Sequence, residues 1–529
     1  MRGIIKADEV PRYIRDGSTI MVTGITLGGF AEEAVIEIEK SFLATGAPRG
    51  LTVYFQSGVG NRKDRGLAHI AHPGLVKRIV GGHLMGCGPA MVALCRDNAA
   101  DVYNLPQGVM ATMCRYIAAR KPGVITKVGL GTMMDPRLGG GKMNARTGAC
   151  EDLVELITIH GEEWLLYKLP RVDVALIRGT VADEKGNVTL TREGYHLGQL
   201  AAAQAARACG GIVICQVENI VEKGSLKPKD VKIPGIVVDY VYVAKPEYHW
   251  QTGQTPYNPV FSGEIRVPLT AVPVEKLSAR KVIARRAAME LNPRDIVNLG
   301  VGIPEAVSSV AAEEGVDGLF TLTTEAGGIG GIPANAHDFG CCWNAEATVE
   351  MADQFDMYDG GVLDFAVLGC LQVGPNGDVN ASMRDGGGIG VGGFVNVAGG
   401  ARRIVFATTM TGGVQQGEGA SVEIRDGSLT IVKEGNQKKF VRQIEQVTFN
   451  GQLAVKNHHE VLFVTERAVF RLTEQGLLLV EVAPGVDIER DVMAQMEFRP
   501  KMSLDVRTMP AEIFRDQWHG LAAIMASKR

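Results

Sequence analysis

The clearest chemical feature of the sequence is one carboxylate followed by a cluster of glycines. Residues 321–333 have the sequence TLTTEAGGIGGIP, in which Glu325 ends a short β-branched run. Such a run predicts a strand, and open α/β sheets bind ligands beyond the carboxyl ends of their strands. The glycines let a substrate approach closely and leave N–H groups free to stabilise negative charge. Glu325 is therefore a candidate functional carboxylate at a ligand site, and a turn carboxylate on the surface is the alternative interpretation.

Two further glycine-rich turns each separate an apolar run from a predicted helix. They comprise Gly24 with Gly28-Gly29-Phe30 near the N-terminus, and Gly300-Val301-Gly302-Ile303-Pro304 in the second half of the chain. Such a turn can direct the amide groups of a helix N-terminus toward an anion. It can equally relieve backbone crowding where a strand meets a helix. Both interpretations apply to both turns.

Other motifs that could carry chemistry are incomplete. Residues 388–393 have the spacing GxGxxG, but no acidic residue follows about 20 positions later, as a dinucleotide site requires. His69 and His72 have HxxH spacing without an acidic or cysteine ligand to complete a metal site. Neither a P-loop nor a GxSxG elbow occurs. We therefore expect no metal, and a dinucleotide-dependent oxidoreductase is a weak alternative.

The elements that must position these residues occur as an internal repeat. IMVTGITLGGFAEEAVIEIEKSF followed by LTVYFQSGVG resembles IVNLGVGIPEAVSSVAAEEG followed by LFTLTTEAGGIGG, roughly 270 residues later. A second pair of segments, beginning at Val172 and Leu363, matches at an offset of 191. In the first copy, Gln56 occupies the position of Glu325. The repeat therefore predicts one active site per chain.

Short apolar runs that alternate with amphipathic stretches are typical of parallel strands covered by helices on both faces. The sequence predicts an α/β protein of two related open domains, each with three layers and a mostly parallel sheet. We place the N-terminal domain at 1–272 and the C-terminal domain, which carries Glu325, at 273–529. Residues 420–482, which include the turn Asp426-Gly427, predict a small antiparallel β addition.

Composition limits the class of protein. The 529 residues carry 55 Lys+Arg and 59 Asp+Glu, a net charge of −4, which gives no basic field for nucleic acid. Nine cysteines without CxxC spacing suggest neither a disulfide framework nor a zinc ribbon. We recognise no signal peptide and no apolar run long enough to cross a membrane. These features predict a cytoplasmic protein with no membrane or nucleic-acid partner.

Together the motifs resemble those of the class I CoA-transferases, in particular the long single-chain type that acts on acetate and propionate. The resemblance covers essentially the whole chain. It is carried by Asp16-Gly17 with Gly28-Gly29-Phe30, Pro106-Gln107-Gly108, Gly300-x-Gly302-Ile303-Pro304, Thr324-Glu325-Ala326-Gly327, and Gly390-Val391-Gly392-Gly393. One departure is Ala31-Glu32-Glu33, which stands where the family signature continues to Gly-x-Pro.

The resemblance implies roles for individual residues. Glu325 would be the covalent nucleophile, with Gln107 and Gly392 or Gly393 as donors to the oxyanion. Substrate or CoA contacts would come from Gly28, Gly29, Phe30, Gly300, Gly302, Ile303, Pro304, Gly327 and Gly390. We also expect surroundings rich in amides to keep Glu325 ionised near neutral pH.

The implied reaction is transfer of CoA between a short-chain acyl-CoA (acetyl-, propionyl- or butyryl-CoA) and a free carboxylate. Coenzyme A is then a substrate, and no further cofactor is implied. The family also suggests a homotetramer or homodimer. An acyl-CoA hydrolase on the same scaffold is the enzymatic alternative, and a non-catalytic sensor of CoA esters is the alternative from another class.

Overall fold

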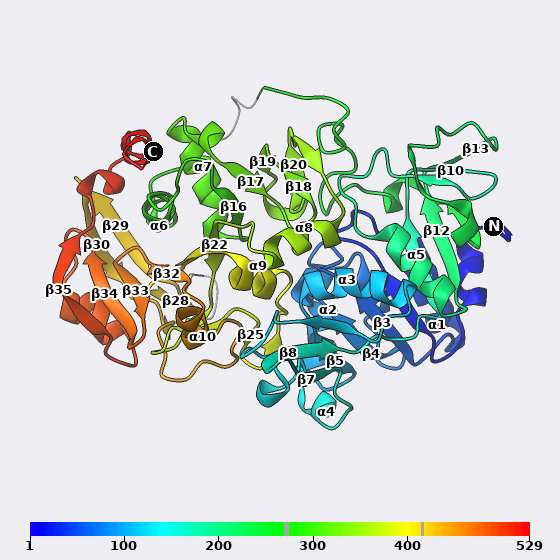
Figure 1. The fold of residues 1–529 in the computed structure, drawn as a ribbon, viewed down its shortest axis with the longest axis horizontal. Helices are drawn as coiled ribbons and strands as arrows, with labels where there is room; N and C mark the ends of the chain where they lie inside the picture. The colour runs from blue at the N-terminus through cyan, green and yellow to red at the C-terminus, as the bar shows by residue number, and fades with distance from the viewer. Residues whose placement is uncertain (269–274, 414–416, 529) are drawn as a thin grey trace. The chain divides into compact units, whose positions relative to one another are not determined.

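The computed structural model describes residues 1–268, 275–413 and 417–528. The chain forms two compact units (Figure 1). The first comprises Met1–Val267, Thr324–Asp356 and Ser382–Asn396, and the second comprises Pro268–Thr323, Met357–Ala381 and Val397–Arg529. The segment that carries Glu325 therefore packs with the N-terminal part of the chain.

The first unit is built on a parallel eight-stranded sheet in the order β1-β15-β12-β9-β2-β3-β4-β5. Its strands are β1 (Gly3–Ile4), β2 (Thr19–Val22), β3 (Leu51–Phe55), β4 (Val76–Gly81), β5 (Asp101–Asn104), β9 (Val174–Arg178), β12 (Ile212–Val217) and β15 (Tyr240–Val243). Their continuous apolar runs are largely buried, as expected for strands covered on both faces.

Helices of the first unit connect and cover these strands. They are α1 (Glu32–Thr45), α2 (Pro89–Arg96), α3 (Gln107–Ala118), α4 (Ala145–Gly148) and α5 (Gln199–Ala208). α1 joins β2 to β3, whereas α5 joins β9 to β12 in the opposite direction along the sheet. Because such crossovers are right-handed, α1 and α5 cover opposite faces. The strand order reverses between β9 and β2, which is where open α/β sheets bind ligands.

Short strands form small sheets around this core. In the first unit these are β6 (Val124–Thr126), β7 (Val154–Ile159), β8 (Glu162–Tyr167), β10 (Val181–Asp183), β11 (Val188–Thr189), β13 (Asn219–Val221), β14 (Val231–Ile233), β19 (Ile332–Pro333), β20 (Cys342–Trp343), β25 (Met383–Arg384) and β26 (Gly387–Gly388). Two further short strands, β18 (Gly328–Ile329) and β21 (Ala347–Thr348), pair antiparallel with each other and belong to a ten-stranded sheet. Two helices, α8 (Met351–Asp359) and α9 (Phe394–Gly400), begin in the first unit and end in the second.

The second unit repeats the same plan. Its strands follow the order β17-β16-β22-β27-β32-β33-β34-β35. Their bounds are β16 (Ile296–Leu299), β17 (Thr321–Thr323), β22 (Phe365–Gly369), β27 (Arg403–Ala407), β32 (Glu460–Val464), β33 (Ala468–Thr473), β34 (Gly476–Val482) and β35 (Lys501–Thr508). Its helices are α6 (Ala279–Ala288), α7 (Ala306–Glu313), α10 (Gly451–Lys456) and α11 (Leu521–Ala526).

The repeat predicted from the sequence is confirmed by strand order. β9, β2 and β3 are neighbours in the first unit, and their counterparts β22, β16 and β17 are neighbours in the second. All four pairings are parallel. The α/β class with mostly parallel sheets is therefore confirmed.

The antiparallel addition is also present. β29 (Ser421–Arg425) and β30 (Ser428–Lys433) form a hairpin whose two turn residues, Asp426 and Gly427, both have positive φ. β33 pairs antiparallel with both β32 and β34, so this part extends the main sheet. The remaining short strands of the second unit are β23 (Gln372–Val373), β24 (Val379–Asn380), β28 (Thr411–Gly412) and β31 (Gln437–Lys438).

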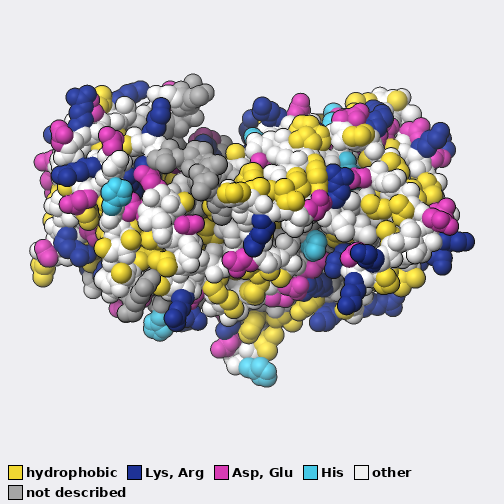
Figure 2. Space-filling model, turned by 90° about the horizontal axis from the view of Figure 1, so that it is seen from above, with side chains coloured by type: hydrophobic (Ala, Val, Ile, Leu, Met, Phe, Trp, Pro, Cys, Tyr) yellow, Lys and Arg dark blue, Asp and Glu magenta, His cyan; other side chains and the backbone are white. Residues whose placement is uncertain are grey.

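The surface carries charges of both signs. On the face seen in Figure 2, Lys and Arg side chains are interspersed with Asp and Glu. Among the described residues, no helix has the length and apolar character needed to cross a membrane.

Candidate active site

Glu325 lies on a tight turn that only glycine can close. The turn follows β17 and leads into β18, and Thr324 Oγ1 accepts from Gly328 N–H at 3.1 Å and donates to Gly340 O at 3.0 Å. Gly327 has φ +103, and a Cβ there would lie 2.0 Å from the carbonyl oxygen of Val349. Gly327 is therefore needed for the geometry of this turn.

The glycine loop 390–393 covers the carboxyl group of Glu325. A Cβ on Gly393 would lie 2.5 Å from Cδ of Glu325, so no larger residue fits there without displacing the carboxyl group. The N–H of Gly393 donates a hydrogen bond to this carboxyl. Gly390 has φ +91, and its own Cβ position lies 2.8 Å from Cα of His83. The GxGxxG spacing thus reflects the close approach of this loop to Glu325. A dinucleotide fingerprint follows a strand of a βαβ unit, whereas β26, at the start of this motif, belongs to a two-stranded antiparallel sheet.

The backbone of Gly392 is already engaged. Its N–H donates to Gly82 O at 2.7 Å, and its carbonyl accepts from the N–H of Gln107 at 2.9 Å. The next residue toward the N-terminus, Val391, donates its N–H to Asn104 Oδ1 at 2.9 Å. The loop is therefore attached to the carboxyl ends of β4 and β5, and of the two glycines only Gly393 has its N–H directed at Glu325.

Gln107 begins α3, directly after Pro106, and is almost fully buried. Its Nε2 donates to Met351 Sδ at 3.4 Å, and its Oε1 lies 3.6 Å from the Cβ position of Gly392. A thioether sulfur is a weak acceptor. The side-chain amide of Gln107 therefore lies beside the loop that covers Glu325. Its hydrogen bond to the Met351 sulfur is weak, so a substrate oxygen could readily replace that acceptor.

His83 is a neighbour of the site that sequence reasoning missed. It follows β4, its Nδ1 accepts from Gly86 N–H at 3.0 Å, and its Cδ2 lies 3.8 Å from the Cβ position of Gly392. Burial, together with the positive charge of Arg62, lowers the pKa of His83 to about 4. The imidazole is therefore neutral, and the bond to Nδ1 places the proton on Nε2. Its position just beyond a strand was the available sequence signal.

The electrostatics of Glu325 correct one expectation. Burial raises the pKa of Glu325 to about 7, and the hydrogen bond from Gly393 opposes this rise without cancelling it. Part of the residue nevertheless remains accessible to solvent. Nearby amides are expected to keep the carboxyl ionised near neutral pH, but a carboxyl with this pKa is only partly ionised there, because loss of hydration outweighs one amide donor.

The N-terminal glycine loop is enclosed by protein. A Cβ on Gly28 would lie 2.3 Å from both Gln251 O and the ring of Tyr195, and the side chain of Phe30 is fully buried in the core. Gly29 donates its N–H to Glu193 Oε2 at 3.2 Å. These three residues therefore contact other parts of the first unit.

This loop also packs beside the turn that carries Glu325. The Cβ position of Gly340 lies 3.3 Å from Cβ of Ala326, 3.4 Å from Cγ2 of Ile25 and 3.1 Å from the ring of Tyr195. Ala326 directly follows Glu325. Ile25, at the start of the loop, and Ala326 therefore share Gly340 as a neighbour.

The remaining predicted residues, Gly300, Gly302, Ile303 and Pro304, belong to the second unit. Gly300 donates its N–H to Val367 O at 2.8 Å, and Gly302, with φ +93, precedes a 3-10 turn over Ile303–Glu305 that leads into α7. The predicted site residues that the structure brings together in the first unit are Glu325, Gly327, Gly390, Gly392, Gly393 and Gln107. The turn at residues 300–304 lies in the second unit.

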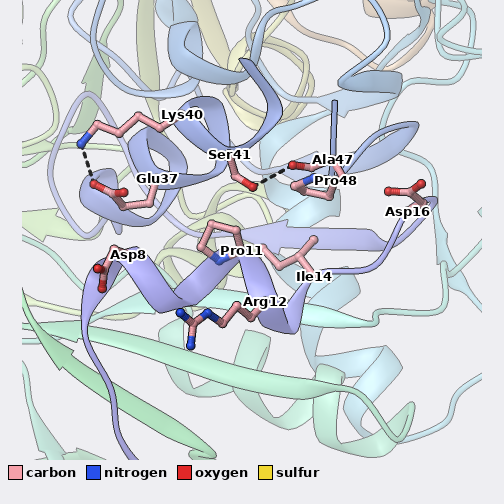
Figure 3. A pocket seen from close by; sticks show the side chains of 10 residues that line it. All are labelled: Asp8, Pro11, Arg12, Ile14, Asp16, Glu37, Lys40, Ser41, Ala47 and Pro48. Carbon is pink, nitrogen blue, oxygen red and sulfur yellow. Dashed lines mark hydrogen bonds and ion pairs between the residues drawn. The ribbon is translucent and has the colours of Figure 1, made fainter. Parts of the chain in front are cut away.

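Figure 3 shows a pocket of about 400 Å³ between the 3-10 helix Ala7–Tyr13 and α1. It is lined by Asp8, Pro11, Arg12, Ile14, Asp16, Glu37, Lys40, Ser41, Ala47 and Pro48. Charges of both signs line it, and none of the predicted catalytic or binding residues does. This pocket is therefore separate from the candidate site.

No group of three His, Cys, Asp or Glu side chains that could hold a metal ion occurs within 1–268, 275–413 and 417–528. The HxxH pair has another explanation. His69 and His72 both hydrogen-bond to Glu39, at 2.7 and 2.6 Å, so the motif links α1 to the segment before β4.

Comparison with known proteins identifies the family. A family model for coenzyme A transferase matches residues 5–244. The chain is 47% identical to the caffeate CoA-transferase of Acetobacterium woodii, over 99% of this chain and 100% of the relative. It is 39% identical to the acetate CoA-transferase YdiF of Escherichia coli K12, over 97% of this chain and 95% of the relative.

Solved structures of a relative have the same fold over almost the whole chain. The acyl-CoA transferase YdiF apoenzyme of E. coli O157:H7 superposes with a TM-score of 0.91 at 38% identity, covering 98% of this chain and 97% of that one. A thioester complex of YdiF with CoA superposes with a TM-score of 0.90 over the same shares at 38% identity. With relatives this similar over their whole length, the chain belongs to the coenzyme A transferase family, as a class I member that carries both repeats in a single chain.

Proposed function

We propose that the protein transfers CoA from an acyl-CoA to a free carboxylate through a covalent thioester on Glu325. The observation that carries this proposal is the contact between Glu325 and Gly393. A carboxyl group with a pKa of about 7 lies against a backbone N–H at a position where only glycine leaves room for it. This arrangement suits a nucleophile that must acquire and lose an acyl substituent.

The reaction would proceed in steps that balance. A carboxylate oxygen of Glu325 attacks the thioester carbonyl, and the tetrahedral intermediate expels CoA thiolate to leave an acyl-glutamyl anhydride. The thiolate then attacks the glutamyl carbonyl, which releases the first carboxylate and forms the glutamyl-CoA thioester. An incoming carboxylate reverses both steps and leaves as a new acyl-CoA. Two covalent steps in place of one conserve the free energy of the thioester.

Two donors would serve two different oxyanions. The N–H of Gly393 already bonds to the Glu325 carboxyl, so it is placed for the oxyanion that forms when the thiolate attacks the glutamyl carbonyl. The amide of Gln107 would serve the oxyanion on the substrate carbonyl, because its present acceptor is only the sulfur of Met351. Loss of one such donor typically costs about 10²–10³ in kcat.

The substrate pair is part of the proposal. We infer a short-chain donor such as acetyl-, propionyl- or butyryl-CoA, and a carboxylate acceptor of similar size. Relatives of this chain are named for acetate and for caffeate, which differ greatly in size. A matrix of acyl-CoA donors against acetate, propionate, butyrate, lactate, acetoacetate and caffeate measures the preference directly.

The decisive experiment is a mass measurement. Incubation of the protein with acyl-CoA alone should add the mass of CoA to the peptide that contains Glu325, and Glu325→Gln should show no adduct. An adduct absent from the wild type, or present in the variant, would contradict the mechanism. The hydrolase alternative predicts CoA release without any carboxylate acceptor, so the acceptor requirement separates the two enzymes.

We further infer a cytoplasmic homo-oligomer, either a dimer or a tetramer. Cysteine usage without a disulfide framework supports this location, and the family resemblance supports the assembly. Light scattering coupled to size-exclusion chromatography measures the assembly.

A further inference from the structure

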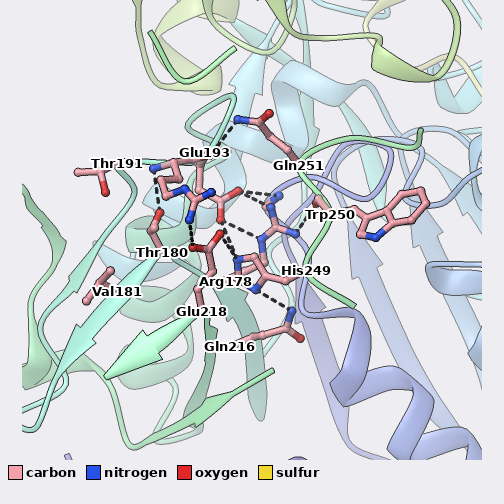
Figure 4. Close-up of polar contacts among 12 residues, drawn as sticks. Arg178, Thr180, Val181, Thr191, Glu193, Gln216, Glu218, His249, Trp250 and Gln251 are labelled. Atoms are coloured by element: carbon pink, nitrogen blue, oxygen red, sulfur yellow. Dashed lines mark hydrogen bonds and ion pairs between the residues drawn. The ribbon is translucent and has the colours of Figure 1, made fainter. Parts of the chain in front are cut away.

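A buried ion pair lies at the carboxyl end of β9, the strand beside the point where the sheet order reverses. Arg178 Nε donates to Glu193 Oε1 at 2.8 Å, and Nη2 donates to Oε2 at 2.5 Å (Figure 4). Each side chain is only 2% exposed. A two-point pair of this kind fixes the orientation of both groups.

The remaining bonds of the pair reach the N-terminal glycine loop. Arg178 Nη1 donates to Leu27 O at 3.0 Å and to Trp250 O at 2.8 Å. Glu193 Oε2 also accepts the N–H of Gly29 at 3.2 Å. The pair therefore binds a carbonyl and an amide on either side of Gly28, and it joins this loop to the segment around Trp250.

His249 also belongs to this cluster, but it is neutral and does not offset the negative charge of Glu193. Its Nδ1 lies 3.3 Å from Gln216 Nε2, while its Nε2 has no hydrogen-bond partner and lies 3.7 Å from Glu193 and 3.8 Å from Glu218. Burial and the nearby Arg178 lower the pKa of His249 to about 4, so it is neutral. Burial alone would raise the pKa of Glu193, but Arg178 holds it well below its usual range. The charge on Glu193 thus depends on Arg178.

Tyr195, two residues after Glu193, extends the contact to the tip of the loop. Its hydroxyl lies 3.4 Å from Ile25 O and from Gln251 O, and 3.3 Å from Thr26 Oγ1. Its ring lies against the Cα of Gly28. Loop residues from Ile25 to Gly29 are therefore restrained by one buried group of side chains.

Within residues 21–30, Thr26 is the one residue that is not buried. It also has φ +53, a strained conformation for a branched residue that persists only where its surroundings impose it. The neighbouring Ile25 and the residue after Glu325, Ala326, both approach the Cβ position of Gly340, at 3.4 and 3.3 Å. The restrained loop thus presents one strained, partly accessible side chain, and it shares the neighbour Gly340 with the turn that carries Glu325.

We propose that Thr26 contacts the carboxylate substrate, and that Glu193 and Arg178 are positioning residues that hold Thr26 in place. This inference rests on the proposed transfer through Glu325. An acyl-CoA binds through both its acyl group and its CoA portion. A free acceptor carboxylate has no CoA portion, so it binds only through contacts at the acyl end of the site. Loss of loop positioning should therefore impair the acceptor half-reaction more than formation of the CoA adduct.

The test compares two variants with two matched controls. Glu193→Gln weakens the ion pair, and its control is Glu481→Gln, which weakens the similarly buried Arg286–Glu481 pair of the second unit. Thr26→Gly removes the side chain at a φ that suits glycine, and its control is His160→Gly, at φ +52 in the exposed turn between β7 and β8. Each variant is assayed for Tm, for CoA adduct by intact mass, and for kcat and carboxylate KM.

The expected result is a rise in carboxylate KM of at least about tenfold for Glu193→Gln and about fivefold for Thr26→Gly. Adduct yield from acyl-CoA should be unchanged in both, and both controls should stay within about twofold of wild type. If Glu193→Gln does not fold, Thr26→Gly decides, because glycine relieves its backbone strain. A wild-type carboxylate KM in Thr26→Gly overturns this inference alone, whereas absence of the adduct in wild type overturns the proposed function as well.

Discussion

The carboxyl carbon of Glu325 lies 2.5 Å from the point that a Cβ on Gly393 would occupy. The same glycine donates its N–H to that carboxyl. One residue therefore provides both the space for the carboxyl group and a hydrogen-bond donor to it. A side chain at position 393 would remove the space and displace the donor together.

Gly393→Ala should lower the rate of CoA adduct formation by at least about 100-fold, because the methyl group would displace the Glu325 carboxyl from its donor. Stopped incubations with acyl-CoA, followed by intact mass, measure that rate. Gly399→Ala is the matched control, since a Cβ there meets no atom within 4 Å. Equal rates in the two variants would contradict the assigned role of Gly393.

The rate of adduct formation should rise with pH and level off above a midpoint near 7. Glu325 attacks only when ionised, and its pKa is raised to about 7. Below the midpoint the rate should fall about tenfold for each pH unit. Single-turnover measurements between pH 5.5 and 8.5 test this, and a flat profile down to pH 5.5 would mean that the carboxyl group ionises as it does in water.

Glu325→Gln should raise the free energy of unfolding at pH 8 by about 1–3 kcal/mol, and much less at pH 5. The folded pKa of about 7 lies above the ordinary value of 4.5, so the protonated carboxyl favours folding at low pH. That contribution is lost as the pH rises through 7. Urea unfolding at both pH values measures it, with Glu474→Gln, at an exposed turn, as the control. An equal effect at both pH values would disprove the shifted pKa.

Gln107→Leu should lower kcat by about 10²–10³ while Tm changes little, because its amide bonds only to the sulfur of Met351. Gln56→Leu is a matched control. Gln56 is also buried, also donates only to a sulfur, that of Cys114, and occupies the repeat position equivalent to Glu325. Steady-state kinetics measure kcat for both variants. A similar loss of kcat in both would mean that altered packing, and not a lost oxyanion donor, is the cause.

The fold could be predicted because it depends on local spacing. Apolar runs of strand length, glycine turns and the helices after them repeat along the chain, and the strand orders β9-β2-β3 and β22-β16-β17 follow from that repeat. The hairpin at Asp426-Gly427 was equally predictable, since its turn needs two residues that accept positive φ.

The candidate site was predictable only in part. Glu325 stood out because the repeat has a carboxylate in one copy and Gln56 in the other. His83 and Met351 could not be found this way, because their contacts with Gly392 and Gln107 join distant parts of the chain.

By itself, then, the sequence determined the repeated βα plan, the family and the identity of the candidate nucleophile, all of which rest on residue type and spacing. Tertiary structure decided three other matters. It packs residues 324–356 with the first unit. It pairs the N–H of Gly29 with the carboxylate of Glu193, and it buries Glu325 so that the pKa of this residue rises. Each of these depends on which distant atoms exclude water from a group or bind to it, and chain order carries no record of that.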